Sequence, residues 1–341
     1  MERVRVSADG KGFQLASSGR RYTPWGFNYD HDDAGRLLED YWEAEWPTVE
    51  EDFREMKELG ATVVRIHLQV NRFMKSPDQP NDKALAQLTR LLALAENVGL
   101  YLDLTGLGCY RKSDTPRWYE EASEKDRWAV QARFWEAVSA TCAKSPAVLC
   151  YNLMNEPLSP AGPAKEWHGG EPLGGYFYVE ALTKDPGKRS RLELTREWIS
   201  TLTPGIRKND PGRLVTCGMF FLFEVANGLT LGPDPKVLAE SLDYFSVHMY
   251  PKDASVDGNL KLLATLQVGK PVVIEELFPL GCSMPSFRRF LTGTREHASG
   301  WIGFYWGKSL EECRRSKNMK DAFIVGWLEY FKEEGGTFKG E

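Results

Sequence analysis

The feature that most limits how this chain can fold is the alternation of short apolar runs with amphipathic helical segments. Eight runs are long enough to form one buried strand each, at residues 24–28, 61–68, 100–104, 151–157, 214–219, 244–249, 271–276 and 301–306. Strands that alternate with helices form a parallel sheet, either closed as a (β/α)8 barrel or open and doubly wound. The count of eight favours the closed (β/α)8 TIM barrel, and no glycine-rich phosphate motif follows the first run, which argues against a nucleotide-binding open sheet.

Helical periodicity with recognisable ends fills the gaps between the runs. Thr48, followed three residues later by Glu51, predicts a capping box, and Gly60 ends that helix. Gly99 is likewise predicted to end the helix at residues 82–98. Pro204 is expected to kink the helix predicted at residues 190–208. The remaining helices are predicted at residues 124–144, 190–208 and 321–333.

The N-terminal residues 1–22 show a different pattern. Apolar and polar residues alternate there around Asp9-Gly10 and Ser18-Gly19, which predicts a short N-terminal β-hairpin. The length of 341 residues would allow two average domains, but α/β barrels of this length are common. We expect a single (β/α)8 catalytic domain over residues 1–341.

Composition and charge exclude several classes of partner. The net charge of -5 provides no basic surface for nucleic acid, and no run of about 18 apolar residues suggests a membrane span. The six cysteines lack metal-binding spacing and are expected to be free thiols. We therefore predict a monomer that is cytoplasmic, or secreted with a signal peptide absent from this sequence, and no partner other than its substrate.

Polar side chains end several of the predicted strands. Glu156 ends the fourth and Glu276 the seventh, and two acids that face each other across a barrel mouth can divide the work of cleaving an acetal. Arg65 beside one carboxylate would keep that group ionised, whereas an acid in a more apolar niche would keep its proton. The other polar or aromatic strand ends are Asn28, His67, Thr105, Asn155, His248, Tyr250 and Trp306.

Three of these strand ends form motifs that resemble glycoside hydrolase family 5, the cellulase and mannanase group of (β/α)8 glycosidases. The motifs are Asn155-Glu156-Pro157, His248-Met249-Tyr250-Pro251 and Pro271-Val272-Val273-Ile274-Glu275-Glu276. The resemblance implies a retaining β-glycoside hydrolase that cleaves β-linked glucan, mannan or related oligosaccharides without a cofactor.

The same resemblance implies a role for each matched residue. Glu156 would be the general acid/base and Glu276 the nucleophile. Asn155 would hold the sugar 2-hydroxyl, and His248 would lie near the acid/base. Arg65 and Tyr250 would orient Glu276, and Trp306 would form the floor of the sugar site. Asn28 and Trp167 complete the expected substrate-binding residues.

The sequence departs from the family pattern at two places. The family often has a histidine where the third strand ends, and this chain has Thr105. Glu275 also stands immediately before Glu276, and strand alternation would send these neighbours to opposite faces of the sheet. Register with the family motif selects Glu276 as the residue that points into the mouth.

Aromatic residues make up 12% of the chain, and flat rings can serve as sugar platforms. The long loop at residues 158–187 is rich in glycine and aromatic residues and would wall one end of the site. The loop aromatics considered as platforms, although packing could account for half of them, are Tyr29, Trp42, Trp46, Tyr110, Trp118, Trp167 and Tyr176.

Two alternatives stay open. A non-catalytic carbohydrate-binding barrel would keep the aromatic residues and lose a catalytic acid. A metal-assisted hydrolase could use the adjacent residues His31, Asp32 and Asp33, but contiguous residues seldom converge on one ion. We therefore predict no metal site.

Overall fold

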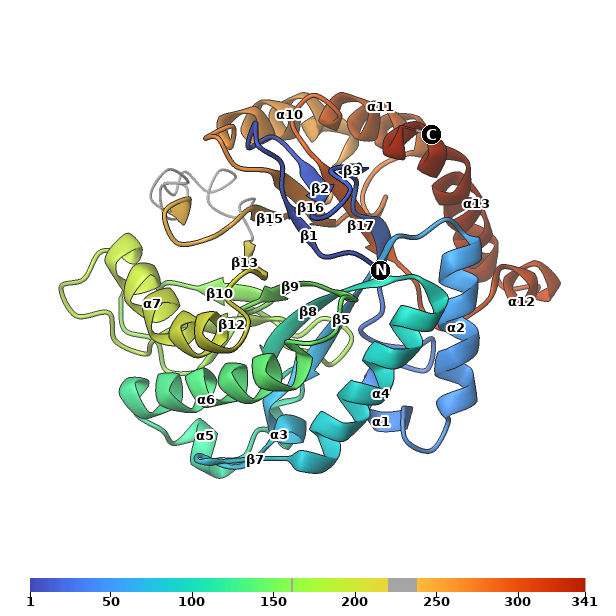
Figure 1. Ribbon diagram of the computed structural model, residues 1–341. Helices are drawn as coiled ribbons and strands as arrows, with labels where there is room; N and C mark the ends of the chain where they lie inside the picture. Colours follow the sequence, from blue (N-terminus) through green and yellow to red (C-terminus); the bar gives the residue numbers. More distant parts are fainter. Residues whose placement is uncertain (161, 220–237, 341) are drawn as a thin grey trace.

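The computed structural model describes residues 1–160, 162–219 and 238–340, and its centre is one parallel sheet (Figure 1). The strand order is β13-β9-β8-β5-β4-β17-β16-β15-β14. The first and last strands of this order, β13 and β14, are separated in the sequence only by Cys217, so the predicted fifth strand closes the sheet on itself. The (β/α)8 barrel is therefore confirmed. Its strands are β4 Trp25–Asn28, β5 Val63–Gln69, β8 Tyr101–Gly108, β9 Val148–Asn152, β13 Leu214–Thr216, β14 Gly218–Met219, β15 Phe245–His248, β16 Val272–Glu276 and β17 Gly300–Phe304.

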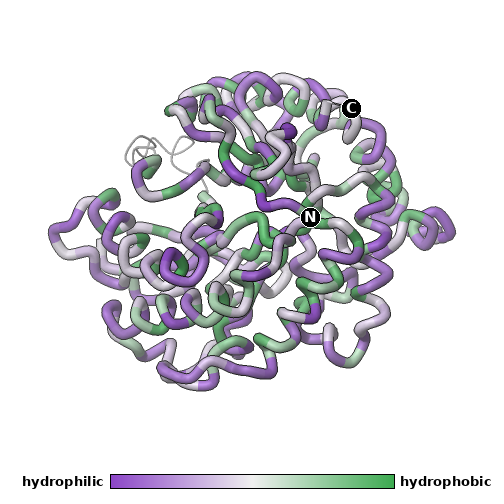
Figure 2. Tube along the Cα trace, viewed as in Figure 1, coloured by the Kyte–Doolittle hydropathy of each residue, from purple (hydrophilic) through white to green (hydrophobic). Residues whose placement is uncertain are grey.

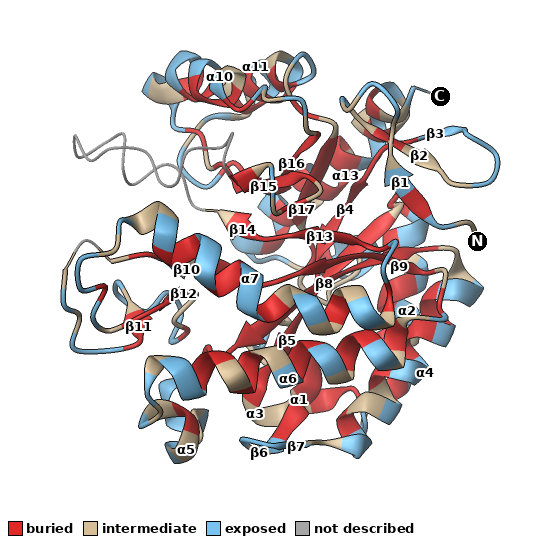
Figure 3. Cartoon of the chain, turned by 60° about the vertical axis from the view of Figure 1, so that its left-hand side comes forward, coloured by how far each residue is buried: buried red, intermediate tan, exposed pale blue. Residues whose placement is uncertain are grey.

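Helices surround this sheet and cover its outer face. The seven longest in the described ranges are α2 Trp46–Glu58, α4 Asp82–Val98, α6 Glu124–Cys142, α7 Arg191–Asn209, α10 Val256–Thr265, α11 Met284–Thr294 and α13 Met319–Lys339. Figure 3 shows the strands buried along their length, while α4, α6 and α7 turn one face to solvent. Hydrophobic residues gather toward the middle of the molecule in Figure 2, and the outer loops are mostly hydrophilic. None of the described helices has both the length and the hydropathy of a membrane span.

The short elements lie in the connections between strands and helices. They are α1 Leu38–Tyr41, α3 Val70–Phe73, α5 Arg117–Glu120, α12 Leu310–Arg315 and the antiparallel pair β6 Met74–Ser76 and β7 Gln79–Pro80.

The structure confirms the helix end that the sequence predicted from a glycine at residue 99. Helix α4 has the predicted bounds, and Gly99 ends it at a φ of 77°, a left-handed conformation that glycine adopts without strain. Thr48 is not the cap of α2, because this helix already begins at Trp46 with a proline in its first turn, where the fixed φ of proline suits a helix. Helix α7 continues past Pro204 to Asn209.

The N-terminal residues form the predicted hairpin, and a third short strand extends it to a three-stranded antiparallel sheet. Its strands are β1 Val4–Val6, β2 Phe13–Leu15 and β3 Arg21–Tyr22. Val4, Phe13 and Tyr22 share a buried cluster with residues near the N-terminal ends of the barrel strands, including Val63, Tyr101, Leu149, Leu214 and Tyr244. This sheet therefore closes the end of the barrel opposite the mouth.

The segment at residues 158–187 is more regular than the sequence predicted. A small sheet in the order β10-β12-β11 spans it, with β10 Glu156–Leu158, β11 His168–Gly169 and β12 Val179–Ala181. Buried Arg127 of α6 pairs with Glu180 of β12 and stacks on the ring of Tyr119 at 3.5 Å. The described residues of the predicted long loop therefore include a small sheet, and strand pairing and a buried ion pair hold this segment against the barrel.

Removing the Phe13 side chain should weaken the closure of the barrel bottom. Phe13 is 2% exposed and packs edge-on against Tyr244 at 5.2 Å between ring centroids. Phe13→Ala should reduce the free energy of unfolding by about 3 kcal/mol or more, the usual loss for a buried phenylalanine. Urea denaturation measures this loss. Phe323→Ala is the matched control because Phe323 is 44% exposed, and equal losses for the two variants would contradict the assignment.

Candidate active site

The two acids predicted from the strand ends meet at the mouth of the barrel. Glu156 begins β10, after a short connection from the end of β9 at Asn152, and Glu276 is the last residue of β16. One oxygen of each carboxyl group and one ring nitrogen of His248 lie within 4.8 Å of one another. Strands β9 and β16 are far apart in the sheet order, so it is the closure of the barrel that brings these acids together.

Glu276 is held by one hydrogen bond to each of its carboxyl oxygens. Arg65 Nη1 donates to Oε1 at 2.7 Å, and the Tyr250 hydroxyl donates to Oε2 at 2.6 Å. Arg65 is fully buried, so its charge acts at short range with little screening by water. The two donors fix the orientation of the carboxylate at the mouth.

Glu156 has a different environment. Its Oε1 lies 2.6 Å from His248 Nδ1, and the residue is 9% exposed. Burial raises the pKa of Glu156 above its usual value, although the contact with His248 opposes this shift. The two facing carboxyl groups are thus unequal, since Glu276 contacts a guanidinium and Glu156 an imidazole.

Arg65 organises the residues behind Glu276. Besides Glu276, its guanidinium donates to Asn28 Oδ1 at 2.8 Å and to Asn155 Oδ1 at 2.7 Å. Asn28 in turn donates to the carbonyl oxygens of Glu275 and Gly303, each at 2.8 Å. Asn28 and Arg65 are fully buried, so these two side chains lie behind Glu276 rather than on an open surface.

Asn155 links this network to the segment after the fourth strand. Its Nδ2 donates to the backbone carbonyl of Tyr178 at 3.1 Å, and its Oδ1 accepts from Arg65. Tyr178 packs against Tyr110 with ring centroids 4.9 Å apart. Residues 158–187 therefore reach the site through Tyr178, a residue that the sequence did not single out as functional.

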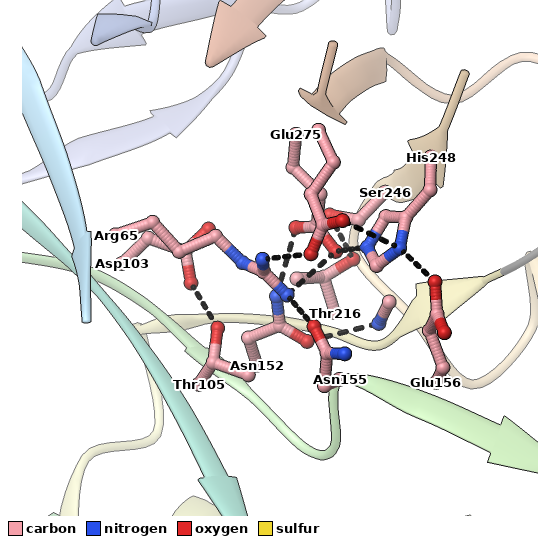
Figure 4. A network of polar contacts seen from close by, with 12 residues as sticks. Arg65, Asp103, Thr105, Asn152, Asn155, Glu156, Thr216, Ser246, His248 and Glu275 are labelled. Atoms are coloured by element: carbon pink, nitrogen blue, oxygen red, sulfur yellow. Dashed lines mark hydrogen bonds and ion pairs between the residues drawn. The ribbon is translucent and has the colours of Figure 1, made fainter. Parts of the chain in front are cut away.

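Glu275 points into the barrel, although strand alternation predicted that it would face away from the mouth that receives Glu276. The pairing of β15 with β16 shifts at this point, with Val247 opposite Ile274 but His248 opposite Glu276. A bulge of this kind places two residues of one strand opposite one of the other, which breaks the alternation. Figure 4 shows Glu275 in the same network as Arg65 and His248. The expectation of opposite faces is therefore wrong here.

The aromatic residues divide into a mouth group and a packing group. Trp306 is half-buried and stacks on Phe304 at 5.8 Å with an interplanar angle of 9°. Trp167 is 1% exposed, donates from Nε1 to the carbonyl of Glu120 and stacks under Arg127 at 4.3 Å. The structure places Trp167 among the packing residues of its segment, which removes the ring face that a sugar platform needs. The other proposed platforms that are buried in the same way are Tyr29, Trp42, Trp46, Tyr110 and Tyr176, whereas Trp118 is half-buried.

Thr105 lies inside the barrel rather than at its rim. It is fully buried, and its hydroxyl donates to Asp103 at 3.3 Å. Strand β8 continues to Gly108, and the aromatic residue that follows, Tyr110, hydrogen-bonds through its hydroxyl to His67 Nδ1. Tyr110, and His67 from the second barrel strand, therefore lie near the position where the family pattern has a histidine at the end of the third strand.

The three residues of the alternative metal hypothesis have separate partners. Asp32 accepts from the guanidinium of Arg36, and Asp33 pairs with Lys308 and Lys320. His31 Nδ1 faces Asp30 at 3.1 Å. Positive side chains already balance the two carboxylates, so this arrangement does not support a metal-assisted reaction at His31, Asp32 and Asp33.

Comparisons with solved structures agree with the barrel fold. Among solved structures, the chain is similar to the exo-β-1,4-mannosidase Op5Man5 from Opitutaceae bacterium strain TAV5, with a TM-score of 0.71, 17% identity and coverage of 98% of this chain and 62% of that one. It is also similar to an endo-1,4-β-mannanase from Eisenia fetida, with a TM-score of 0.65, 14% identity and coverage of 97% and 96%. The chain thus spans 62% of the length of the exo-mannosidase.

Sequence comparison identifies the family. A search of curated proteins found no match. A sequence model of the cellulase family, glycosyl hydrolase family 5, matches residues 7–277, which include Glu156 and Glu276. This match covers most of the chain and agrees with the barrel and with the motifs at its strand ends. The chain belongs to glycoside hydrolase family 5 and is a glycoside hydrolase with a (β/α)8 barrel.

Proposed function

We propose that this chain is a retaining β-glycosidase in which Glu276 is the nucleophile and Glu156 the general acid/base. The observation that carries the proposal is the approach of one oxygen from each carboxyl group to within 4.8 Å of the other. Retaining glycosidases hold these groups roughly 5 to 5.5 Å apart, whereas inverting enzymes need roughly 6.5 to 9.5 Å to admit a water molecule. The short separation favours direct attack by a carboxylate.

In the first step, a carboxylate oxygen of Glu276 forms a bond to the anomeric carbon of the sugar. The bond from that carbon to the leaving oxygen breaks, and its electron pair stays on the oxygen, which takes the proton of Glu156. Arg65 and Tyr250 keep the attacking carboxylate in place because each donates to one of its oxygens. The products are a glycosyl ester on Glu276 and a free leaving group.

In the second step, Glu156 is a carboxylate and acts as a base. It takes a proton from a water molecule whose oxygen attacks the anomeric carbon. The ester bond breaks, its electron pair returns to Glu276, and Glu156 regains its proton. Burial suits the first step, because a raised pKa favours the protonated form of Glu156.

The substrate class that we propose is β-1,4-linked mannan or manno-oligosaccharide. The names of two structurally similar proteins support it, since one is an exo-β-1,4-mannosidase and the other an endo-1,4-β-mannanase. The family model is described as a cellulase, which keeps β-linked glucan as the second candidate. Half-buried Trp306 at the mouth offers an aromatic face to either sugar.

Loss of either acid should abolish most of the turnover of an oligosaccharide. Glu276→Ala should lower kcat at least about 10⁴-fold on every substrate, because no bond to the anomeric carbon can form. Glu156→Ala should lower it about 10² to 10⁴-fold on oligosaccharides, the usual contribution of general acid catalysis. The loss of kcat/KM should be smaller on a dinitrophenyl β-glycoside, because kcat/KM reports the first step and this leaving group departs without a proton.

The control for these variants is the configuration of the product. Proton NMR of the first product formed by the unmodified protein should show the β-anomer. The α-anomer, or full turnover by either alanine variant, would overturn the assignment. Activity that disappears on treatment with a chelator and returns with a divalent ion would favour the metal-assisted alternative instead.

A product profile should identify the sugar and the mode of action. We expect faster release of products from β-1,4-mannan and manno-oligosaccharides than from β-glucans of equal length. Release of single mannose units would indicate exo action, and a ladder of oligosaccharides endo action. Mass spectrometry of timed digests measures both. Binding of these sugars without any turnover would favour the non-catalytic barrel.

The environment of Glu156 also predicts a pH-dependent stability difference. Its pKa in the folded state is raised above the ordinary value of 4.5, so folding favours the protonated form. Below pH 4.5 the carboxyl group is protonated in both the folded and the unfolded state, so it does not change the free energy of unfolding with pH. As the pH rises from 4.5 toward the folded-state pKa, the unfolded chain releases the proton first, and the free energy of unfolding falls relative to that of a variant with a neutral residue at this position. Glu156→Gln should therefore gain stability over the unmodified protein as the pH rises.

Urea denaturation between pH 4 and pH 8 checks this expectation. Glu166→Gln is the matched control, because Glu166 is solvent-exposed and its pKa is lowered by Lys112. The control should show no gain at high pH. A stability difference for Glu156→Gln that stays constant or shrinks as the pH rises would show that Glu156 does not hold its proton.

A further inference from the structure

Glu275 is a buried carboxylate to which the double displacement assigns no role. It is fully buried, and its Oε1 lies 3.1 Å from His248 Nε2 and 3.4 Å from Arg65 Nη2. Its Oε2 accepts from Asn152 Nδ2 at 2.8 Å. Burying a charge without partners costs several kcal/mol, so this side chain stays charged only because cations and a donor surround it.

The barrel is shaped to receive this carboxylate. A Cβ atom at Gly218, the first residue of β14, would lie 2.7 Å from Glu275 Oε1 and 2.0 Å from the carbonyl oxygen of Asn155. Gly218 also donates its N–H to Asn152 Oδ1, which leaves the amide of Asn152 free to hold Glu275. Any larger residue at this position would displace either Glu275 or the backbone that precedes Glu156.

His248 lies between Glu275 and Glu156. Its Nε2 faces Glu275, and its Nδ1 lies 2.6 Å from Glu156 Oε1, as Figure 4 shows. A doubly protonated ring donates to both carboxyl groups and leaves the proton of Glu156 free to face the substrate. A neutral imidazole that donates from Nε2 to Glu275 can only accept a hydrogen bond at Nδ1. Glu156 would then have to direct its own O–H toward His248 instead of toward the substrate.

We propose that Glu275 is a positioning residue that holds His248 as an imidazolium and thereby directs the proton of Glu156 toward the leaving oxygen. The inference rests on the acid role of Glu156 proposed above. It adds a third carboxylate to the two that react, and this third group touches neither the sugar nor the water. It acts only through the charge and the hydrogen bonds of His248.

The charges around the ring agree with this role. Burial alone would discharge His248, but the nearby carboxylates outweigh it and raise the pKa of the imidazole to about 10. Burial also opposes ionisation of Glu275, yet Arg65 and His248 lower its pKa. The titratable groups that interact with His248 are Glu156 from β10, Glu275 and Glu276 from β16, and His67 from β5. Arg65 from β5 and Asp103 from β8 act on this set through Glu275.

Charge balance explains why a third carboxylate is needed. Arg65 and a charged His248 bring two positive charges, and Glu276 alone would compensate only one of them while Glu156 is protonated. With Glu275 ionised, the charges of these four residues sum to zero. If Glu275 were neutral, the excess positive charge would be relieved by loss of a proton from His248 or from Glu156, because Arg65 cannot lose its own, and either loss would disturb the acid proton of Glu156.

The direct test is an NMR titration of the His248 ring in the protein without substrate. With ¹⁵N-labelled histidine, the ring of the unmodified protein should stay doubly protonated from pH 5 to beyond pH 8, and His248→Asn identifies its signals. In Glu275→Gln the amide oxygen can still accept from Nε2, but the charge is gone. The pKa of His248 should then fall by about one unit or more, the usual effect of losing one adjacent opposite charge.

Kinetics supplies a readout that general damage to the fold would not move. Glu275→Gln should reduce kcat/KM about 10-fold or more for an oligosaccharide, whose leaving oxygen needs a proton, and less than about 3-fold for a dinitrophenyl β-glycoside. Asp210→Asn is the matched control, because Asp210 is an equally buried acid that pairs with Arg213 at 2.9 Å and contacts none of the residues around His248. Its effect should be the same for both substrates.

The possible outcomes separate this inference from the proposed function. A His248 ring that is neutral at pH 7 in the unmodified protein would overturn the inference, whether or not Glu275→Gln folds. An unchanged titration in Glu275→Gln, or equal kinetic losses on both substrates, would also overturn it. None of these results would touch the roles of Glu156 and Glu276, which depend on their own variants and on the configuration of the product.

Discussion

The buried guanidinium of Arg65 is the interaction on which the site depends. It contacts groups from three other strands or strand ends, namely Asn28, Asn155 and the two acids Glu275 and Glu276. A charge at this depth is stable only when its partners are in place, because water cannot replace them. The geometry of the nucleophile is therefore coupled to the closure of the barrel, since those partners meet at one guanidinium only when the sheet is closed.

Two further constraints bring the acids together. The fifth strand is divided into β13 and β14, so one half pairs with β9 beside Glu156 and the other with β15 beside His248. The bulge between β15 and β16 turns both Glu275 and Glu276 inward. Both irregularities lie at the mouth of the barrel. They interrupt the regular pairing of the strands there, which lets the side chains of the site converge. The N-terminal sheet closes the other end, where no catalytic residue was expected.

The sequence predicted the barrel and the two acids because both depend on local patterns. The strands are recognised from apolar runs, and the helices from their periodicity and from the glycines at their ends. An acid at the C-terminal end of a barrel strand must lie at the mouth of the barrel. The inward position of Glu275 could not be predicted, because the alternation of side chains along a strand holds only until a bulge interrupts it. Trp167 was misjudged for a related reason, since loop aromatics look alike in a sequence whether they face solvent or pack over Arg127. The nearest sequence signal for Glu275 was the unusual pair of adjacent acids.

The cost of burying these groups explains why the site is so fully connected. Burial raises the pKa of Glu156, which its proposed role requires, but the same burial penalises every other charge nearby. The low-dielectric interior makes each ion pair stronger and each unpaired charge more costly. A site that needs one carboxyl group to stay neutral beside others that stay charged must therefore balance its charges closely. In this barrel Arg65, a protonated His248, Glu275 and Glu276 would form such a set, and the proposed acid role of Glu156 depends on this compensation.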